Sequence, residues 1–352
     1  MKSTRIIGSL LAAAVLVSCA GNFEKVREND ADQTILVETT AADATEESTA
    51  PEPVPFEFNA HVYSKTVSPR IPQDYWDSFY NLCDALRAGE TSFACSSQEA
   101  YAWCTDMSVL CNYFPAAGTK VGAGSSDGSV PFENGIGRIH YTVPVEEYLA
   151  RQADFEALIT GIINDNVESD DSEYEKALKL YVYMANNYTY DDNMDYEDNF
   201  VYHTFTTKKG VCGNFAATYT YLLLQVGIDA VHVGCFEEDM CHAWTYAVID
   251  GKGYYIDPTW GLKSTWEGVD YIYLDYFMMS DHERNIDGCM VYDLTADVLP
   301  EFWINMTPVH LTAEDSSYNL RDLCNFVRLD EDNKILYYTD MSGNIREFRY
   351  EV

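Results

Sequence analysis

Three residues in the second half of the chain have the types and spacing of a cysteine-enzyme site. Cys212 lies in the segment KGVCGNFA, His242 in CHAW and Asp257 in YIDPTW. A thiolate is a strong nucleophile, an imidazole can move a proton between the thiol and a leaving amine, and a carboxylate on the second ring nitrogen fixes the tautomer. These residue types predict attack on an amide carbonyl through a thioester.

The segment that follows Cys212 predicts the helix that presents the thiol. Apolar residues recur at helical spacing over 215–226, and Gly227 is a typical C-terminal stop. A cysteine at a helix N-terminus beside a cationic imidazole is more acidic than an ordinary thiol. Gly210 and Gly213 allow a tight entry turn and leave the sulfur unshielded. The free N–H groups of the first turn, at Gly213 among others, are expected to face an oxyanion.

The dipeptide DG at 250–251 predicts where the carboxylate lies relative to the imidazole. It favours a two-residue type I′ turn between strands at 242–249 and 252–257. Counting along the ladder from that turn places Asp257 on the face of His242, diagonally and about 7–8 Å away by backbone. A hydrogen bond between the two side chains is therefore expected. A one-residue slip would put the carboxylate on the opposite face.

The order and spacing of the three segments resemble the transglutaminase-like superfamily, in which a cysteine opens a helix, a histidine opens a strand and an aspartate closes the next strand. The resemblance runs over residues 172–282 and includes YFMMSD at 276–281. It implies an α+β fold with a papain-like core, in which a catalytic helix packs on an antiparallel sheet. It also implies a Cys212, His242 and Asp257 triad that needs no cofactor and no metal.

Other residues are weighed for the surroundings of the triad. Tyr190 stands where some relatives carry an aromatic residue near the site. It is expected either to help bind the oxyanion or to be an aromatic residue of the core or of the rim of the site. Trp244, which the ladder places opposite Asp257, and Trp260 are expected to wall the cleft, with core packing as the alternative. Cys241 is a rival nucleophile, disfavoured because it precedes a strand and points away from His242 by alternation.

Two further groups of polar residues favour structural roles. The acidic run at 191–198 lacks the order and the glycine of an EF-hand loop, so a solvated loop is favoured over a calcium site. His203 and His232 are expected to be structural or exposed. Neither group is assigned to the chemistry.

The N-terminal residues predict export and membrane attachment. Residues 1–18 form a basic start, an apolar run and a small-residue end, which is the layout of a signal peptide. The letters LVSC ending at Cys19 resemble a lipobox, which implies lipidation of Cys19; a plain signal peptide cleaved nearby is the alternative. Residues 19–55 are acidic, poor in aromatic residues and proline-rich at the end, as in a disordered tether. An extracytoplasmic protein held by a lipid anchor alone is expected.

Periodicity divides the remainder into three parts. Residues 56–165 predict a mixed α/β extension that packs on the core. The resemblance implies the catalytic core at residues 166–299, and residues 300–352 predict a β-rich segment packed on that core. The expected helices are near 73–88, 96–112, 146–163 and 172–187, the last with a capping box at Ser172 and Glu175. The expected strands are near 139–143, 229–236, 323–329, 334–339 and 344–350, with a turn at 342–344 in the last hairpin.

The net charge of the chain limits the classes of partner that it can bind. The formal charge of −35, from 22 basic and 57 acidic residues, excludes binding to a phosphate backbone. A peptide or protein substrate and a monomeric state are expected.

Ten cysteines are present. Setting aside Cys19 and Cys212 leaves eight that an exported protein could pair into four disulfides, Cys235 with Cys241 among them; buried free thiols are the alternative.

The three residues by themselves do not choose among the reactions that they allow. The resemblance to small bacterial lipoproteins with this type of domain, which are often hydrolase-like, implies hydrolysis of peptide or protein amide bonds as the first expectation. A lysine amine as acceptor would make the chain a cross-linking acyltransferase. A different class is a binding or scaffold module that keeps the transglutaminase-like fold without catalysis.

Overall fold

The computed structural model describes residues 55–124, 128–193, 200–237, 240–286, 311–318, 320–322 and 324–350. They belong to one unit that starts at Pro55. The expectations for the signal peptide, for Cys19, for the tether and for most of the acidic run lie outside the described residues. Within the described part, no helix combines the length and the hydropathy of a membrane span.

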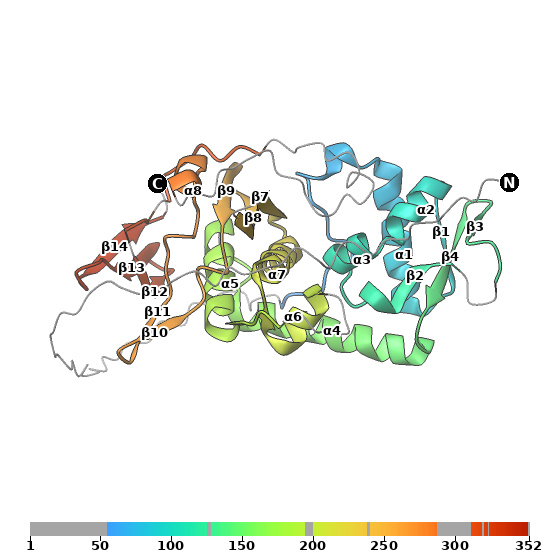
Figure 1. Ribbon diagram of the computed structural model, residues 1–352, viewed down its shortest axis with the longest axis horizontal. Coiled ribbons are helices and arrows are strands. Elements are labelled where there is room, and N and C mark those ends of the chain that lie inside the picture. Colours follow the sequence, from blue (N-terminus) through green and yellow to red (C-terminus); the bar gives the residue numbers. More distant parts are fainter. Residues whose placement is uncertain are drawn as a thin grey trace, which may run out of the picture. The chain divides into compact units, whose positions relative to one another are not determined.

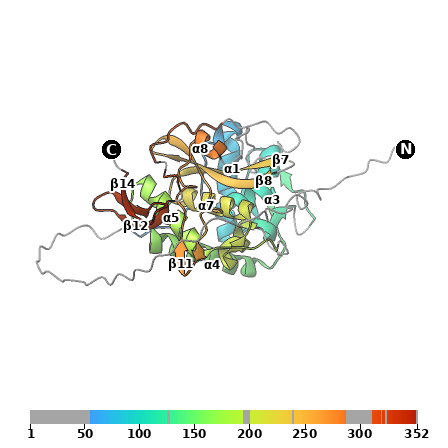
Figure 2. The ribbon, with the colours of Figure 1, turned by 60° about the vertical axis from the view of Figure 1, so that its left-hand side comes forward.

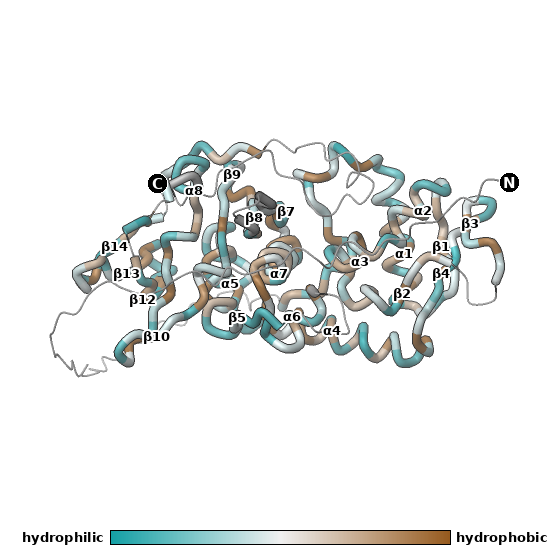
Figure 3. The backbone as a smooth tube through the Cα atoms, in the orientation of Figure 1, coloured by the Kyte–Doolittle hydropathy of each residue, from teal (hydrophilic) through white to brown (hydrophobic). Residues whose placement is uncertain are grey.

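Helix α7 lies against an antiparallel sheet in the second half of the chain (Figures 1 and 2). The sheet has the order β7-β8-β9. Every residue of α7 except Gly213 is buried, including the polar Asn214 and Gln225, so the helix lies inside the core although its hydropathy is mixed (Figure 3). These elements are α7 (Cys212–Gln225), β7 (Asp229–Glu237), β8 (Met240–Ile249) and β9 (Lys252–Ile256).

The hairpin between β8 and β9 has the predicted register. Asp250 and Gly251 have φ values of 50° and 76°, so both residues of the turn are left-handed, as a type I′ turn requires. Ile249 pairs with Lys252, and the ladder continues to the pair of Thr245 with Ile256. The next step along the ladder sets Trp244 opposite Asp257, so the expected arrangement of the two strands is confirmed.

Helix α5 (Glu173–Asn187) begins at the predicted capping box. The Glu175 N–H donates to Ser172 Oγ at 3.2 Å, and the Ser172 N–H donates to Glu175 Oε2 at 2.8 Å. Glu175 also accepts hydrogen bonds from the Tyr350 hydroxyl at 2.6 Å and from Lys334 Nζ at 2.9 Å. This buried carboxylate therefore joins α5 to the C-terminal sheet.

The C-terminal residues form the expected three-stranded sheet, in the order β12-β13-β14. Gly343, with a φ of 75°, lies in the turn of the last hairpin, and the Gly343 N–H donates to the Asp340 carbonyl oxygen at 2.8 Å. The strands are β12 (Asn325–Asp330), β13 (Ile335–Thr339) and β14 (Ile345–Arg349).

The segment before the core is mixed α/β, and one of its helices differs from the prediction. The helix expected over 96–112 is two helices, because Asp106 interrupts it: its side chain accepts the Ser108 N–H at 2.8 Å and caps the second helix. The elements are η1 (Ser68–Arg70), α1 (Gln73–Ala88), β1 (Ser92–Ala94), α2 (Gln98–Cys104), α3 (Met107–Tyr113), η2 (Gly118–Lys120), β2 (Val121–Ala123), β3 (Phe132–Glu133), β4 (Ile136–Tyr141) and α4 (Val145–Asn166).

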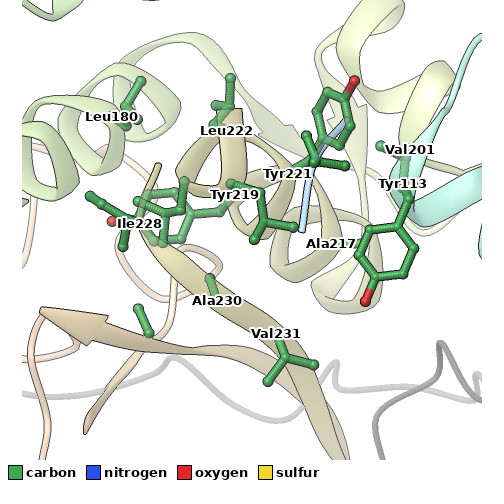
Figure 4. Close-up of a cluster of buried hydrophobic side chains, with 14 of the residues drawn as sticks. Tyr113, Leu180, Val201, Ala217, Tyr219, Tyr221, Leu222, Ile228, Ala230 and Val231 are labelled. Atoms are coloured by element: carbon green, nitrogen blue, oxygen red, sulfur yellow. The ribbon is translucent and has the colours of Figure 1, made fainter. Parts of the chain in front are cut away.

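This N-terminal segment packs directly on the core. Phe155 of α4 lies 5.6 Å from Phe205 and 6.0 Å from Tyr221, between ring centroids. Gln225, at the end of α7, exchanges two hydrogen bonds with the backbone of Asn59, at 2.9 and 2.8 Å. One buried cluster runs through both parts; Figure 4 shows side chains of α3, α5, α6, α7 and β7 in it. The remaining elements are β5 (Thr189–Tyr190), α6 (Phe200–Thr207), β6 (Lys209–Gly210), β10 (Ser264–Trp266), β11 (Val269–Tyr271) and α8 (Asp281–Ile286).

The cysteines of the described residues are free thiols. The expectation of four disulfides is wrong for those cysteines, and the alternative of buried thiols is the correct one. Two of the sulfurs donate hydrogen bonds to backbone oxygens: Cys95 Sγ to the Ser97 carbonyl oxygen at 3.4 Å and Cys104 Sγ to that of Tyr75 at 3.6 Å. The free, buried cysteines are Cys83, Cys95, Cys104, Cys111, Cys212 and Cys324. The expectations for the side chains of Cys235 and Cys241 lie outside the described residues.

Candidate active site

Cys212 is the first residue of α7, and the turn before it depends on Gly210. A Cβ at Gly210 would lie 2.6 Å from the Cβ of Asn214. Asn214 needs that space because its side chain accepts the Val211 N–H at 3.4 Å and donates to Thr204 Oγ1 at 3.0 Å. The asparagine thereby binds the start of α7 to α6. Gly210 is required for this close approach, which fixes the position of the Cys212 thiol.

Gly213 leaves one side of the helix start open. A Cβ built on Gly213 has no atom within 4 Å, and Gly213 is the one residue of α7 that is not buried. The N–H groups of a first helical turn have no partner within the helix. The expected approach of substrate to this turn is compatible with the geometry, and oxyanion binding at Gly213 stays a prediction.

His242 and Asp257 are joined by a short hydrogen bond in the interior. His242 Nε2 lies 2.6 Å from Asp257 Oδ2. The exposed fraction is 4% for His242 and 0% for Asp257, so water does not compete for this contact. Because Nε2 is taken by the carboxylate, Nδ1 is the ring nitrogen that remains for proton exchange. The predicted contact across β8 and β9 is present.

His242, Arg284 and the turn after β9 together keep the pKa of the Asp257 carboxyl group low. Asp257 Oδ1 accepts the Thr259 N–H at 3.0 Å and the Trp260 N–H at 3.3 Å. Burial alone would raise the pKa of the carboxyl group. The charge and the hydrogen bond of His242, the charge of Arg284 and the Trp260 N–H outweigh burial and lower the pKa below its ordinary value. Asp257 is therefore an anion at neutral pH.

The same balance makes the His242 imidazole a cation. Burial opposes the charged ring, but the charge and the hydrogen bond of Asp257 favour it, and a hydrogen bond and charge interaction with Cys212 add to that effect. Together they raise the pKa of His242 from 6.5 to about 9. Cys212 also packs against Ala243, the next residue of β8. The structure thus brings the three predicted residues together.

The two tryptophans have different positions. Trp260 is partly exposed and stacks on His242, with ring centroids 4.9 Å apart and an angle of 20° between the planes. Trp244 has no exposed surface. The expectation that Trp244 walls a cleft is wrong: it lies two residues deeper along β8 and is covered by the guanidinium of Arg284, so core packing is correct.

Tyr190 lies close to the start of α7. It pairs with Gly210 through the parallel bridge of β5 and β6, and its ring centroid is 6.2 Å from that of Phe215. Its exposed fraction is 43%, which excludes a core position and supports the rim alternative. A role of Tyr190 in oxyanion binding stays a prediction.

Comparison with known proteins agrees with this geometry. Residues 161–258 match the family model of the transglutaminase-like superfamily. The chain carries a transglutaminase-like domain. The comparison with curated proteins gives no match.

Two solved structures resemble parts of the chain. One is a candidate cysteine protease from Cytophaga hutchinsonii, 22% identical over 31% of this chain and 38% of that one, with a TM-score of 0.26. The other is a TGase, 20% identical over 42% of this chain and 47% of that one, with a TM-score of 0.27. The chain spans less than half the length of either structure.

Sequence reasoning missed one residue beside this candidate site, Arg284 of α8. Its Nη1 lies 3.6 Å from Asp257 Oδ2. It arrives there because the segment before α8 runs beside β9: Tyr255 and Met279 exchange two backbone hydrogen bonds of 2.8 Å, and the Asp257 N–H donates to the Tyr276 carbonyl oxygen at 2.8 Å. The letters SDHE at 280–283 are a capping-box pattern that could have revealed the helix.

The other polar candidates do not reach the triad. His232 is buried in β7, opposite Thr245, and His203 is partly exposed on α6. Both positions agree with structural roles. The side chain of the rival nucleophile Cys241 lies outside the described residues.

Proposed function

We propose that this chain is a cysteine enzyme that cleaves peptide or protein amide bonds, with Cys212 as nucleophile, His242 as acid and base, and Asp257 as the orienting carboxylate. The observation that carries the proposal is the 2.6 Å hydrogen bond between His242 and Asp257, beside a free cysteine at the start of α7. This is the spatial pattern by which cysteine–histidine catalysis is recognised.

The reaction has two halves. The Cys212 thiolate attacks the carbonyl carbon, the oxygen becomes an oxyanion, and the imidazolium of His242 gives its proton to the leaving amine as the C–N bond breaks. The acyl group is then a thioester on Cys212. An acceptor adds to the thioester carbonyl, His242 takes the acceptor's proton, and the C–S bond breaks to restore the thiolate.

Water is the acceptor that we rank first. It gives a carboxylic acid and makes the chain a peptidase or amidohydrolase. A lysine amine in place of water gives an isopeptide bond and makes the chain a cross-linking acyltransferase. Hydrolysis ranks first because water needs no second binding site on the protein.

A binding or scaffold module is the second candidate. The observation that favours it is the low exposure of the chemical groups: 4% for Cys212 and 4% for His242. A site that stays covered would present a surface without turning over substrate. Labelling with a thiol reagent at mildly acidic pH separates the two: an enzyme labels at Cys212 faster than an ordinary thiol, and a closed module does not.

Activity profiling tests the enzymatic proposal. The wild type and Cys212→Ala are offered peptide libraries with and without an amine donor, and products are identified by mass spectrometry. We expect cleaved peptides from the wild type without the donor and none from Cys212→Ala. Cys324→Ala, which removes another free buried cysteine, should cleave like the wild type. Equal cleavage by Cys212→Ala and the wild type would refute the proposed nucleophile.

We also propose that the enzyme is a monomer held at the extracytoplasmic face of a membrane through lipid on Cys19. The lipobox-like LVSC supports this. Cell fractionation of the wild type and Cys19→Ser tests it, with loss of the membrane-bound fraction as the expected result.

A further inference from the structure

Lys208 is a half-buried lysine with no carboxylate partner among the residues that the structure describes. Its Nζ donates to the Tyr183 hydroxyl at 2.8 Å and to the Tyr188 hydroxyl at 3.2 Å. Burial raises the pKa of both phenols, so the two acceptors are neutral. Burial also lowers the pKa of Lys208 to about 8, because an ammonium group taken out of water without an opposite charge is unfavourable. The side chain is therefore held in place at a cost in free energy.

The two tyrosines form a cage that fixes the position of the amine. Their rings lie edge to face, with centroids 6.0 Å apart and 78° between the planes. The Lys208 Nζ is 5.4 Å from the Tyr183 centroid and 4.8 Å from the Tyr188 centroid, both within cation–π range. Tyr183 belongs to α5, Tyr188 directly follows α5, and Lys208 directly follows α6. The lysine side chain thereby ties the end of α6 to the end of α5.

The backbone of Lys208 is strained. Its φ of 61° lies in the left-handed region, which glycine or asparagine usually occupies at the end of a helix. In this conformation the Lys208 N–H donates to the Thr204 carbonyl oxygen at 2.9 Å, and the Lys208 carbonyl oxygen accepts the Thr189 N–H at 2.9 Å. The first bond closes α6, and the second begins the bridge between β5 and β6. Such strain persists where surrounding contacts hold the residue, and the tyrosine cage supplies contacts of that kind.

The bridge between β5 and β6 leads to the candidate active site along the backbone. Tyr190 pairs with Gly210, and the Asp191 N–H donates to the Gly210 carbonyl oxygen at 2.9 Å. Gly210 is the residue whose missing side chain makes room for Asn214, and it lies two positions before Cys212. A shift of β6 would therefore move the entry turn of the nucleophile together with the rim residue Tyr190.

A second connection to the site runs through side chains. Tyr188 packs edge to face on Phe215, the fourth residue of α7, with ring centroids 6.1 Å apart and 87° between the planes. Lys209, the next residue along the chain, has a different partner: it is exposed, and its Nζ lies 3.3 Å from Asp191 Oδ2. Of these two adjacent lysines, Lys208 is the one that joins the end of α5 to the start of α7.

We propose that Lys208 is a positioning residue of the candidate active site, which locks β5 onto β6 through the tyrosine cage and so holds the entry turn of Cys212 and the rim residue Tyr190 in one conformation. This role rests on the proposed function, because it concerns the alignment of the nucleophile that amide cleavage requires. Lys208 acts through Tyr183 and Tyr188 and takes no part in the making or breaking of bonds.

Lys208→Gly separates this role from an ordinary contribution to stability. Glycine adopts the left-handed conformation without strain, so the chain keeps its turn while it loses the cage. Hydrogen–deuterium exchange of the full chain, read by mass spectrometry with fragmentation that resolves single amides, follows the Thr189 and Asp191 N–H groups. Peptide hydrolysis gives kcat and KM. In Lys208→Gly we expect both amides to exchange about tenfold faster and kcat to fall about tenfold, with KM unchanged.

Further variants identify the cage as the cause. Lys208→Arg keeps a cation with hydrogen-bond donors and should restore most of kcat. Tyr183→Phe keeps the ring and removes one acceptor, so it should lower kcat by less than Lys208→Gly does, and the double variant should be no slower than Lys208→Gly alone. Lys209→Met, the control at the adjacent lysine, should match the wild type in kcat and in the exchange of the Thr189 amide. Urea unfolding verifies that each variant is folded in the assay.

A merely structural role gives a different result. Lys208→Gly would then unfold at a lower urea concentration and keep the kcat of the wild type, which overturns the proposal. A lower kcat without faster exchange of the Thr189 and Asp191 amides also overturns it, because the loss would not come from the bridge between β5 and β6.

The exchange measurement involves no substrate. Faster exchange in Lys208→Gly, with no cleavage by any form of the chain, supports the lock of β5 onto β6 and removes the proposed function. Cleavage that depends on Cys212, with equal exchange and equal kcat in the wild type and Lys208→Gly, leaves the proposed function standing and removes the role of Lys208.

Discussion

Trp260 lies flat on His242, with ring centroids 4.9 Å apart and 20° between the ring planes. The same residue donates its backbone N–H to Asp257 Oδ1 at 3.3 Å. One short turn after β9 therefore supplies the carboxylate that binds the imidazole edge and the ring that covers the imidazole face. The orientation of the imidazole depends on residues within four positions of each other in the sequence.

Replacing Trp260 should lower activity through the orientation of His242. A stacked aromatic pair adds about 0.5–1.5 kcal/mol, so Trp260→Ala should reduce kcat/KM by roughly 2- to 12-fold, and Trp260→Phe by less. The measurement is peptide hydrolysis at several pH values. Trp266→Ala is the matched control, because Trp266 is 63% exposed on the β10–β11 hairpin. Equal losses in Trp260→Ala and Trp266→Ala would contradict the role of the stack.

Replacing Asp257 should change both the rate and its pH dependence. The charge of Asp257 raises the pKa of His242, so Asp257→Asn should lower that pKa and move the alkaline limb of the profile toward acid pH. Loss of the orienting carboxylate should reduce kcat by about 10³–10⁴-fold, as in serine proteases. The profile of kcat against pH gives both values. Asp315→Asn, which alters a carboxylate paired with Lys252, should change neither kcat nor the position of the alkaline limb. An alkaline limb that stays in place in Asp257→Asn would be evidence against the pairing of His242 with Asp257.

The raised pKa of His242 should make stability depend on pH. Since the pKa rises from 6.5 to about 9 on folding, the imidazolium stabilises the fold fully below pH 6.5, and this contribution is lost as the pH rises to about 9. The loss is at most on the order of 3 kcal/mol. Urea unfolding of the wild type and His242→Gln between pH 6 and pH 10 measures it. The wild type should lose more stability than the variant over that interval, and identical slopes would rule the contribution out.

Two glycines at the start of α7 should respond in opposite ways to alanine. In Gly210→Ala the new methyl group meets Asn214 at 2.6 Å, so we expect a loss of about 1–3 kcal/mol in the free energy of unfolding. In Gly213→Ala the methyl group enters open space, and a helical alanine should leave stability unchanged or raise it by up to about 1 kcal/mol. Urea unfolding compares them. Similar stabilities of the two variants would mean that the helix start accommodates Asn214 in another way.

The contact between His242 and Asp257 could be predicted because a local pattern determines it. A two-residue turn at 250–251 fixes the pairing of Ile249 with Lys252, and the alternation of a strand then fixes the face of every residue along the ladder. The helix start at Cys212 was similarly local, since the apolar spacing and Gly227 lie within the helix and its stop. No information from distant parts of the chain was required.

Most of the features that sequence reasoning missed depend on contacts between residues far apart in the sequence. Arg284 is buried because the segment at 276–279 packs along β9. The residues next to Arg284 in the sequence do not indicate this packing. Trp244 shares a strand face with His242, yet it is buried, with the Arg284 guanidinium over its ring and Tyr255 at its edge. The disulfide expectation failed because a count of cysteines contains no geometry. The break of the helix expected over 96–112 was local, and Asp106 as an N-cap could have revealed it.

The hydrogen bonds of Glu175 have a consequence for engineering the chain. Its carboxylate accepts hydrogen bonds from the first turn of α5 and also from Lys334, which directly precedes β13, and Tyr350, which directly follows β14. A version that ends before residue 334 would therefore keep every residue of the triad. It would nevertheless leave the buried Glu175 carboxylate without two of its hydrogen-bond donors. Minimal enzymes cut from this protein should end after residue 350, or replace Glu175 by a residue that tolerates the loss.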